Sequence, residues 1–61
     1  NQGGRMKVGD LVKFRIHPGM YLPEVYYLIT KVAPGDLIFL CGFPSNQVFR
    51  PEQLEVVSES R

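Results

Sequence analysis

Two side chains of this sequence, one histidine and one cysteine, are of the types that serve as base and nucleophile in covalent catalysis. His17 stands between Ile16 and Pro18 in a segment typical of a loop, whereas Cys41 ends an apolar run. We therefore expect His17 to be solvated and Cys41 to be a small buried hydrophobic residue, with a reactive thiol as the alternative. Because burial suppresses a thiolate, the pair does not predict an enzyme unless oligomers assemble a shared site.

The sequence also lacks the ligand sets that metals and phosphates require. A structural zinc site takes four ligands at spacings such as Cys-x₂-Cys or His-x₃-His, and one His with one Cys falls short. There is no glycine-rich loop with a following lysine that would hold a phosphate. We predict no metal and no cofactor. A single cysteine forms no internal disulfide, which fits a reducing compartment or one whose redox state does not matter to the protein.

The aromatic residues are better candidates for function. The chain has three tyrosines and four phenylalanines, more than a domain of 61 residues can bury. We expect Tyr21, Tyr26 and Phe43 to stay on the surface, since two of them lie in predicted loops and Tyr26 shares a strand face with Thr30. Exposed tyrosines suit an interface, although scattered surface aromatics without a role are the alternative.

Basic residues near the start of the chain offer a second candidate surface. Lys13 and Arg15 fall on one face of a predicted strand, and Arg5 and Lys7 precede it. Such a stripe, with tyrosines that stack on bases, is one way in which small barrels bind nucleic acid. The alternative is cross-strand pairing of these cations with Glu55. The net charge of +1 is far from the strongly basic balance typical of nucleic-acid binding.

Short strands must position these residues, because apolar residues alternate with a period of two and no long helical spacing occurs. Pro34-Gly35-Asp36 is a tight-turn sequence that predicts an antiparallel hairpin between the middle strands. The predicted elements are strands over residues 11–16, 24–32, 37–41, 47–50 and 55–57, with a long loop after the first strand and a helical turn over residues 51–54 before the last.

The length leaves room for one domain. Residues 1–5 are polar and glycine-rich, and we interpret them as a vector remnant or a disordered lead; residues 6–57 are the predicted folded unit, and 58–61 a disordered tail. No apolar run is long enough to span a membrane and no signal peptide is recognisable, so the sequence predicts a cytoplasmic protein with no membrane partner.

Two motifs bracket most of the predicted folded unit. Lys7-Val8-Gly9-Asp10-Leu11-Val12 resembles the V-G-D-x-V opening of many Src-homology-3-like (SH3-like) barrels, and Pro51-Glu52-Gln53-Leu54-Glu55-Val56 resembles their closing P-x-x-L-E-V turn and strand. The resemblance implies an all-β, five-stranded SH3-like barrel with one short helical turn before the last strand. The chain is also similar to small uncharacterised barrel proteins of tailed phages, including those of marine cyanobacteria, which would place it in the host cytoplasm. This similarity implies no activity.

A third segment resembles the domains that bind proline-rich peptides. Gly42-Phe43-Pro44-Ser45-Asn46 is similar to their G-x-x-P-S-N-Y sequence, but Gln47 stands where those domains have tyrosine. The chain also has no tryptophan, so the aromatic floor of a polyproline groove is missing. We do not expect polyproline binding.

We therefore predict a non-catalytic binding or assembly module that acts on a protein partner, a second copy of itself included. The predicted hairpin over residues 26–41 is apolar on both faces, and a chain of this size cannot cover both by itself. The alternatives are a nucleic-acid-binding barrel that uses Lys13 and Arg15, and an accessory subunit of a larger enzyme complex.

Overall fold

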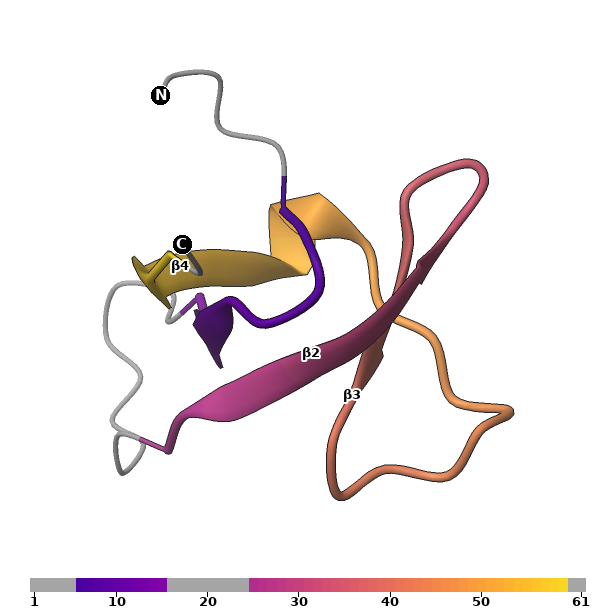
Figure 1. Ribbon diagram of the computed structural model, residues 1–61, viewed down its shortest axis with the longest axis horizontal. Helices are drawn as coiled ribbons and strands as arrows, with labels where there is room; N and C mark the ends of the chain where they lie inside the picture. The colour runs from indigo at the N-terminus through magenta and orange to yellow at the C-terminus, as the bar shows by residue number, and fades with distance from the viewer. Residues whose placement is uncertain (1–5, 16–24, 60–61) are drawn as a thin grey trace.

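The protein folds as one antiparallel sheet, which confirms the predicted all-β class. The computed structural model describes residues 6–15 and 25–59, and the predicted lead, His17, Tyr21 and residues 60–61 lie outside this part. The sheet order is β3-β2-β1-β4, with a short 3-10 turn leading into the last strand (Figure 1). The elements are β1 (Leu11–Phe14), β2 (Tyr27–Ala33), β3 (Leu37–Leu40), η1 (Pro51–Gln53) and β4 (Leu54–Ser58).

A buried carboxylate holds the turn that leads into β1. Asp10 is 1% exposed, and its carboxylate accepts a hydrogen bond from the backbone N–H of Lys7 at 3.0 Å and lies 3.3 Å from the Lys7 ammonium. Gly9 has φ 98°, a conformation that favours glycine. The turn is tied to β2, because Gly9 donates to the carbonyl of Ile29, and Ile29 donates to the carbonyl of Asp10. The Gly and Asp of the V-G-D sequence therefore supply the backbone conformation and the buried acceptor that this turn needs.

Strand β1 lies in the middle of the sheet and pairs with both β2 and β4. Val12 is opposite Tyr27 on one side and Val56 on the other, and Val12 and Phe14 face the core as the alternation predicts. Lys13 is opposite Glu55 on the outer side. The first and last strands are thus neighbours, as expected. The predicted continuation of this strand to Ile16 lies outside the described residues.

Strands β2 and β3 form the predicted antiparallel hairpin. The turn between them places Gly35 at φ 84° and Asp36 at φ 59°, which glycine and aspartate tolerate better than most residues. A β-bulge interrupts the ladder, because Ile29 pairs with Leu40 whereas Lys31 pairs with Phe39. Two residues of β2, Thr30 and Lys31, therefore lie opposite one residue of β3.

The fourth strand predicted over residues 47–50 is reduced to a single bridge, between Phe49 and Ile38, with both hydrogen bonds at 2.9 Å. Local turns take the neighbouring donors. Gln47 donates its backbone N–H to the carbonyl of Pro44, and Arg50 donates its own to the side chain of Gln53 at 2.8 Å. The ladder cannot lengthen while these turns hold, so the described residues contain four strands.

The 3-10 turn η1 confirms the predicted helical turn. Pro51 occupies its first position, where a missing N–H costs nothing. The carbonyl of Gln53 accepts a hydrogen bond from the backbone N–H of Arg15 at 3.0 Å, which fixes the turn to the end of β1. Within the described residues, no helix has the length and apolar character needed to cross a membrane.

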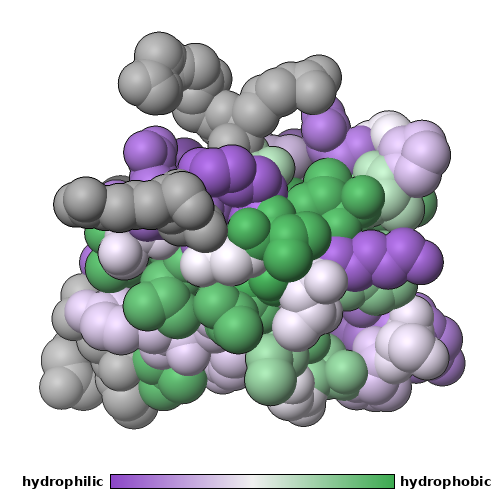
Figure 2. Space-filling model, viewed as in Figure 1, coloured by the Kyte–Doolittle hydropathy of each residue, from purple (hydrophilic) through white to green (hydrophobic). Residues whose placement is uncertain are grey.

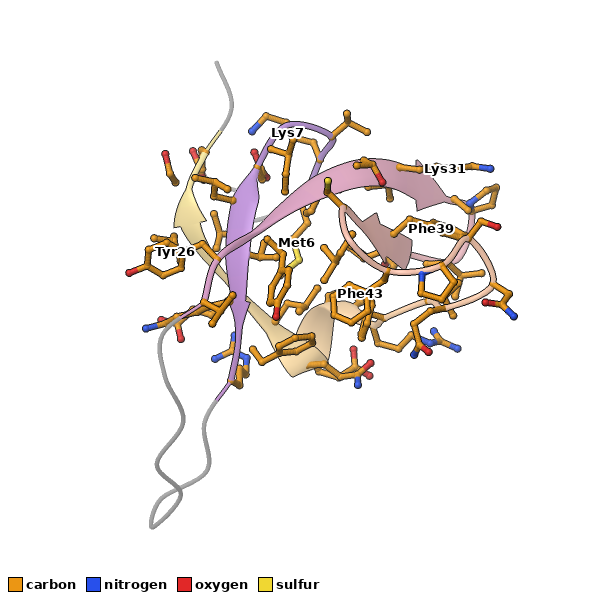
Figure 3. The ribbon with its side chains drawn as sticks, turned by 90° about the horizontal axis from the view of Figure 1, so that it is seen from below. Met6, Lys7, Tyr26, Lys31, Phe39 and Phe43 are labelled. Atoms are coloured by element: carbon orange, nitrogen blue, oxygen red, sulfur yellow. The ribbon has the colours of Figure 1, made fainter. Side chains whose placement is uncertain are left out.

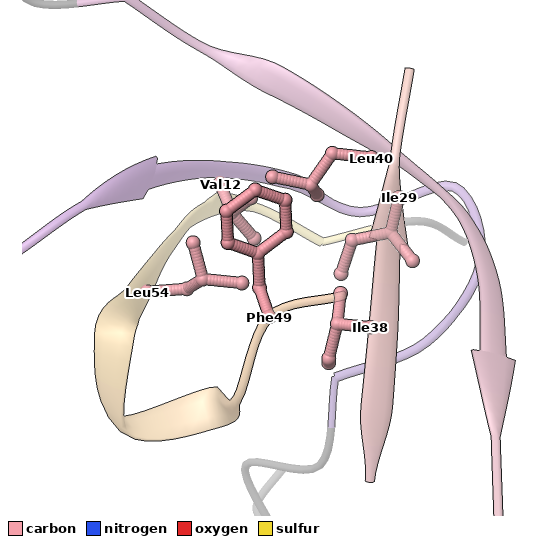
Figure 4. Packing of buried hydrophobic residues seen from close by; sticks show 6 residues of the cluster. All are labelled: Val12, Ile29, Ile38, Leu40, Phe49 and Leu54. Atoms are coloured by element: carbon pink, nitrogen blue, oxygen red, sulfur yellow. The ribbon is translucent and has the colours of Figure 1, made fainter. Parts of the chain in front are cut away.

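The core is small and draws on every strand. Phe49 lies among the aliphatic side chains, so the irregular segment before η1 closes one side of the core (Figure 4). Met6 and several aromatic residues pack around its margin. The buried residues are Val12, Ile29, Ile38, Leu40, Phe49 and Leu54 (Figure 4).

Cys41 is exposed, so the expectation that it would be buried is wrong. Leu40 points into the core, and side chains alternate along an extended chain, so the next residue projects away from the core. Only the backbone of Cys41 is tied to the sheet, since its N–H donates to the carbonyl of Leu28 at 2.8 Å. An apolar run alone does not tell which of its residues face inward.

We expect the thiol of Cys41 to react with a thiol-specific reagent in the native protein almost as fast as in the denatured chain, within about tenfold, because no opening of the fold is needed to reach it. Absorbance of the released chromophore measures both rates. Cys41→Ser should change the free energy of unfolding by less than about 0.5 kcal/mol. Native protection of more than about a hundredfold would place the thiol in the interior instead.

Candidate functional site

Exposed hydrophobic side chains collect on the outer side of the sheet. Leu11 is directly opposite Leu28, so both project from the same face. Tyr26 lies two residues before Leu28, just ahead of β2, and Val57 lies on β4 where the register with β1 shifts, between the partners of Leu11 and Val12. Tyr26, Leu28 and Val57 are 47%, 43% and 42% exposed. Figure 2 shows hydrophobic residues across the middle of the face on which β2 lies in front. We call Leu11, Tyr26, Leu28 and Val57 the outer patch.

The charges beside the outer patch are balanced. Lys13 and Glu55 are register partners on the same side of β1 and β4, so one cation and one anion stand next to each other. The carboxylate of Asp10 lies 3.3 Å from the Lys7 ammonium at the start of β1. Of the residues proposed for a basic stripe, Arg15 is exposed at the end of β1, and Arg5 lies outside the described residues. Acidic residues therefore accompany both lysines of this stripe.

The predicted surface position of Phe43 is not what the structure shows. Its ring is half-buried in an aromatic cluster, with centroids 4.9 Å from Phe49, 5.1 Å from Tyr27 and 6.2 Å from Phe14. The turn after β3 directs the side chain inward, because Gly42 takes φ 95° and the N–H of Phe43 donates back to the carbonyl of Leu40. Phe43 thus supports the core, although it also borders a pocket.

That pocket is formed by the β2–β3 hairpin and the loop that follows it, and it has a volume of about 340 Å³. The bulge brings Thr30 and Lys31 to it from β2, and the ring of Phe39 lies opposite them on β3. Leu40 of β3 also lines it, and Phe43, Pro44 and Ser45 complete its wall from the following loop. The Lys31 ammonium lies 5.3 Å from the centroid of the Phe39 ring, so the cation is held against an apolar wall (Figure 3).

The structure separates the residues that the sequence singled out. Tyr26 projects from one side of the molecule, whereas Phe43 lies with Phe39 and Lys31 on the other (Figure 3). Tyr21 lies outside the described residues. Sequence reasoning missed Leu11 and Val57 as part of one surface with Tyr26, because that neighbourhood depends on β4 pairing with β1. It also missed the pocket, because nothing in the sequence marks Thr30 as a bulged residue.

The described residues hold no group of three or more histidine, cysteine, aspartate or glutamate side chains that could bind a metal. Every buried side-chain nitrogen or oxygen in the same part of the chain has a hydrogen-bond partner. No buried polar atom among them therefore points to a missing ligand, and the outer patch and the pocket are the two surfaces with features suited to binding.

Comparisons of the chain with protein-family models, with curated proteins and with solved structures found no match. The function of the protein is therefore to be sought in the outer patch and the pocket themselves.

Proposed function

We propose that this protein is a non-catalytic assembly module that pairs with a second copy of itself through the outer patch. The observation that carries the proposal is the patch itself, since three large hydrophobic side chains more than 40% exposed share one sheet face with Leu11. An apolar surface of this kind costs solubility unless a partner covers it. Leu11, Leu28 and Val57 lie on paired strands, so most of the surface is preorganised.

For the architecture we propose an SH3-like barrel. The order of parts supports it: an opening turn and strand, a middle hairpin, a bridge from β3 to Phe49, and a 3-10 turn before a last strand that returns to β1. The single bridge at Phe49 stands where such a barrel has its fourth strand. On this proposal residues 47–50 are a shortened strand.

A second copy is the favoured partner because the face is complementary to itself. Two-fold symmetry brings the same surface of both subunits together, so Lys13 of one copy can meet Glu55 of the other without repulsion. Covering the exposed part of each side chain, close to half for Tyr26, Leu28 and Val57 and less for Leu11, contributes roughly 1 kcal/mol on average, or roughly 8 kcal/mol for four residues on each copy. With an association cost of about 4 kcal/mol, the low end for a preorganised surface, the balance leaves a weak dimer with a Kd of the order of 1 mM.

We expect the weight-average mass in sedimentation equilibrium to rise toward that of a dimer between about 0.05 and 2 mM protein, a range that brackets the expected Kd. Leu28→Glu should keep the protein monomeric throughout, because it places an extra charge in the apolar centre of the interface. Val48→Glu is the matched control, since Val48 is exposed but lies outside the outer patch.

Charge reversal tests the pairing. Lys13→Glu should weaken the dimer, because it brings carboxylates from both copies together, and the double variant Lys13→Glu with Glu55→Lys should restore it. A wild-type protein that stays monomeric at about 2 mM would refute self-association. Equal effects of Leu28→Glu and Val48→Glu would show that another surface forms the dimer.

Nucleic-acid binding through Lys13 and Arg15 is the alternative function. Self-association is favoured over it because Asp10 and Glu55 lie beside Lys7 and Lys13, and these carboxylates would repel a phosphate backbone. Binding of an oligonucleotide that weakens steeply with salt would favour the nucleic-acid function. An accessory role in a larger complex would use the same outer patch against a different protein.

A further inference from the structure

The pocket beside the bulge combines one cation with apolar walls. Lys31 is the one charged residue in its lining, and the rings of Phe39 and Phe43 together with Pro44 supply most of the rest. The lining contains no carboxylate, so the charge is complementary to an anion. The flat rings favour an apolar group attached to that anion.

The bulge makes this combination possible. In a regular ladder one residue of β2 would lie opposite Phe39, whereas here Thr30 and Lys31 both do. Thr30 uses its hydroxyl to donate to the carbonyl of Phe39 at 3.3 Å, which closes the ladder around the extra residue. Bulges are a common means of redirecting a side chain next to a binding site.

The walls of the pocket are fixed before any ligand arrives. Phe43 packs against Phe14, Tyr27 and Phe49, so its ring is part of the aromatic cluster. The contact of the Lys31 ammonium with Phe39 restrains an otherwise flexible side chain. Less side-chain entropy is then lost when a ligand binds the ammonium. The hydroxyl of exposed Ser45 is a further donor at the rim.

We propose that this pocket binds a carboxylate attached to a small apolar group. This chemistry is shared by a free aromatic acid and by the C-terminal residue of a peptide. The carboxylate is placed at Lys31 and Ser45, and the apolar group lies against Phe39, Phe43 and Pro44. A volume of about 340 Å³ is at the small end of the range for ligand sites, and it has room for one ring or one aliphatic side chain with its carboxylate.

The test is a titration of isotopically labelled protein followed by amide chemical shifts in NMR spectra, with 3-phenylpropionate and its amide as the first pair of probes. The acetylated peptide Gly-Gly-Phe, as free acid and as C-terminal amide, is the second pair. We expect shifts confined to residues of the pocket. Each acid should bind about fivefold more tightly than its amide, the factor expected for one exposed ion pair.

Lys31→Gln should remove this fivefold preference without weakening the binding of the amides, because it deletes the charge and keeps most of the side chain. Lys7→Gln, which removes a lysine beside Asp10 instead, should leave it unchanged. The measurements are made in the Leu28→Glu background, so that self-association does not contribute. If the peptide acid binds more tightly than 3-phenylpropionate, the ligand is a chain terminus. If 3-phenylpropionate binds more tightly, the ligand is a small free acid. Equal affinities of acids and amides, or an unchanged preference in Lys31→Gln, would overturn the proposal.

Discussion

Replacing Phe49 by alanine is expected to unfold most of the protein at room temperature. The side chain is 7% exposed, and its ring centroid lies 5.3 Å from that of Phe14 and 4.9 Å from that of Phe43. Removing a core phenylalanine costs about 3–5 kcal/mol. A domain of this size has a total stability of similar magnitude, about 3–5 kcal/mol, so little folded protein should remain. Urea denaturation followed by circular dichroism measures the loss.

Two variants separate the packing of this ring from the backbone bridge. Phe49→Leu keeps an apolar side chain and should cost about 1–2 kcal/mol, leaving a cooperative transition. Val48→Ala removes a side chain that is 39% exposed on the preceding residue and should cost about 0.5 kcal/mol. If the free energy of unfolding of Phe49→Ala lies within about 1 kcal/mol of the wild-type value, the segment before η1 does not close the core.

Asp10→Ala is expected to destabilise the protein by about 2–3 kcal/mol. The substitution removes a buried acceptor and leaves the backbone N–H of Lys7 without its carboxylate partner, and hydrogen bonds to charged groups contribute about 1.5–3 kcal/mol. The opening turn is also what ties Gly9 and Asp10 to Ile29 of β2, so its loosening reaches the core. The free energy of unfolding from urea titrations is the measurement.

The partner of the ion pair supplies the control for Asp10. Lys7→Gln removes the surface ammonium but keeps the backbone N–H, so it should cost at most about 1 kcal/mol. Asp10→Asn keeps one acceptor oxygen and should fall between the two. Equal costs for Asp10→Ala and Lys7→Gln would mean that the exposed ion pair, and not the buried backbone hydrogen bond, is what Asp10 provides.

The parts of the fold that local chemistry determines could be predicted from the sequence. Alternation placed Val12 and Phe14 on the core side of β1, and Pro34-Gly35-Asp36 gave the hairpin turn. Pro51 marked the helical turn before β4. Each of these features depends on residues within a few positions of one another.

The features that the sequence did not reveal depend on contacts between distant segments. The bulge at Thr30 is a property of the pairing with β3, and the outer patch requires β4 to lie beside β1. Residues 47–50 have the composition of a strand, but turns on both sides compete for their donors. Phe43 has the sequence context of a loop aromatic, and its burial depends on Phe49 and Tyr27, which come from other segments of the chain. Cys41 shows that hydrophobicity does not fix the direction of a side chain at the end of a strand.

The pairing of β1 with β4 has a consequence for the synthesis of the protein. Val12 needs Val56 beside it, and these two residues are separated by most of the chain. The sheet therefore cannot be completed strand by strand during synthesis, because β1 lacks one of its two neighbours until Leu54–Ser58 has left the ribosomal exit tunnel. The β2–β3 hairpin can pair before β4 is made, but closure of the long loop between β1 and β4 is expected to be a late step of folding.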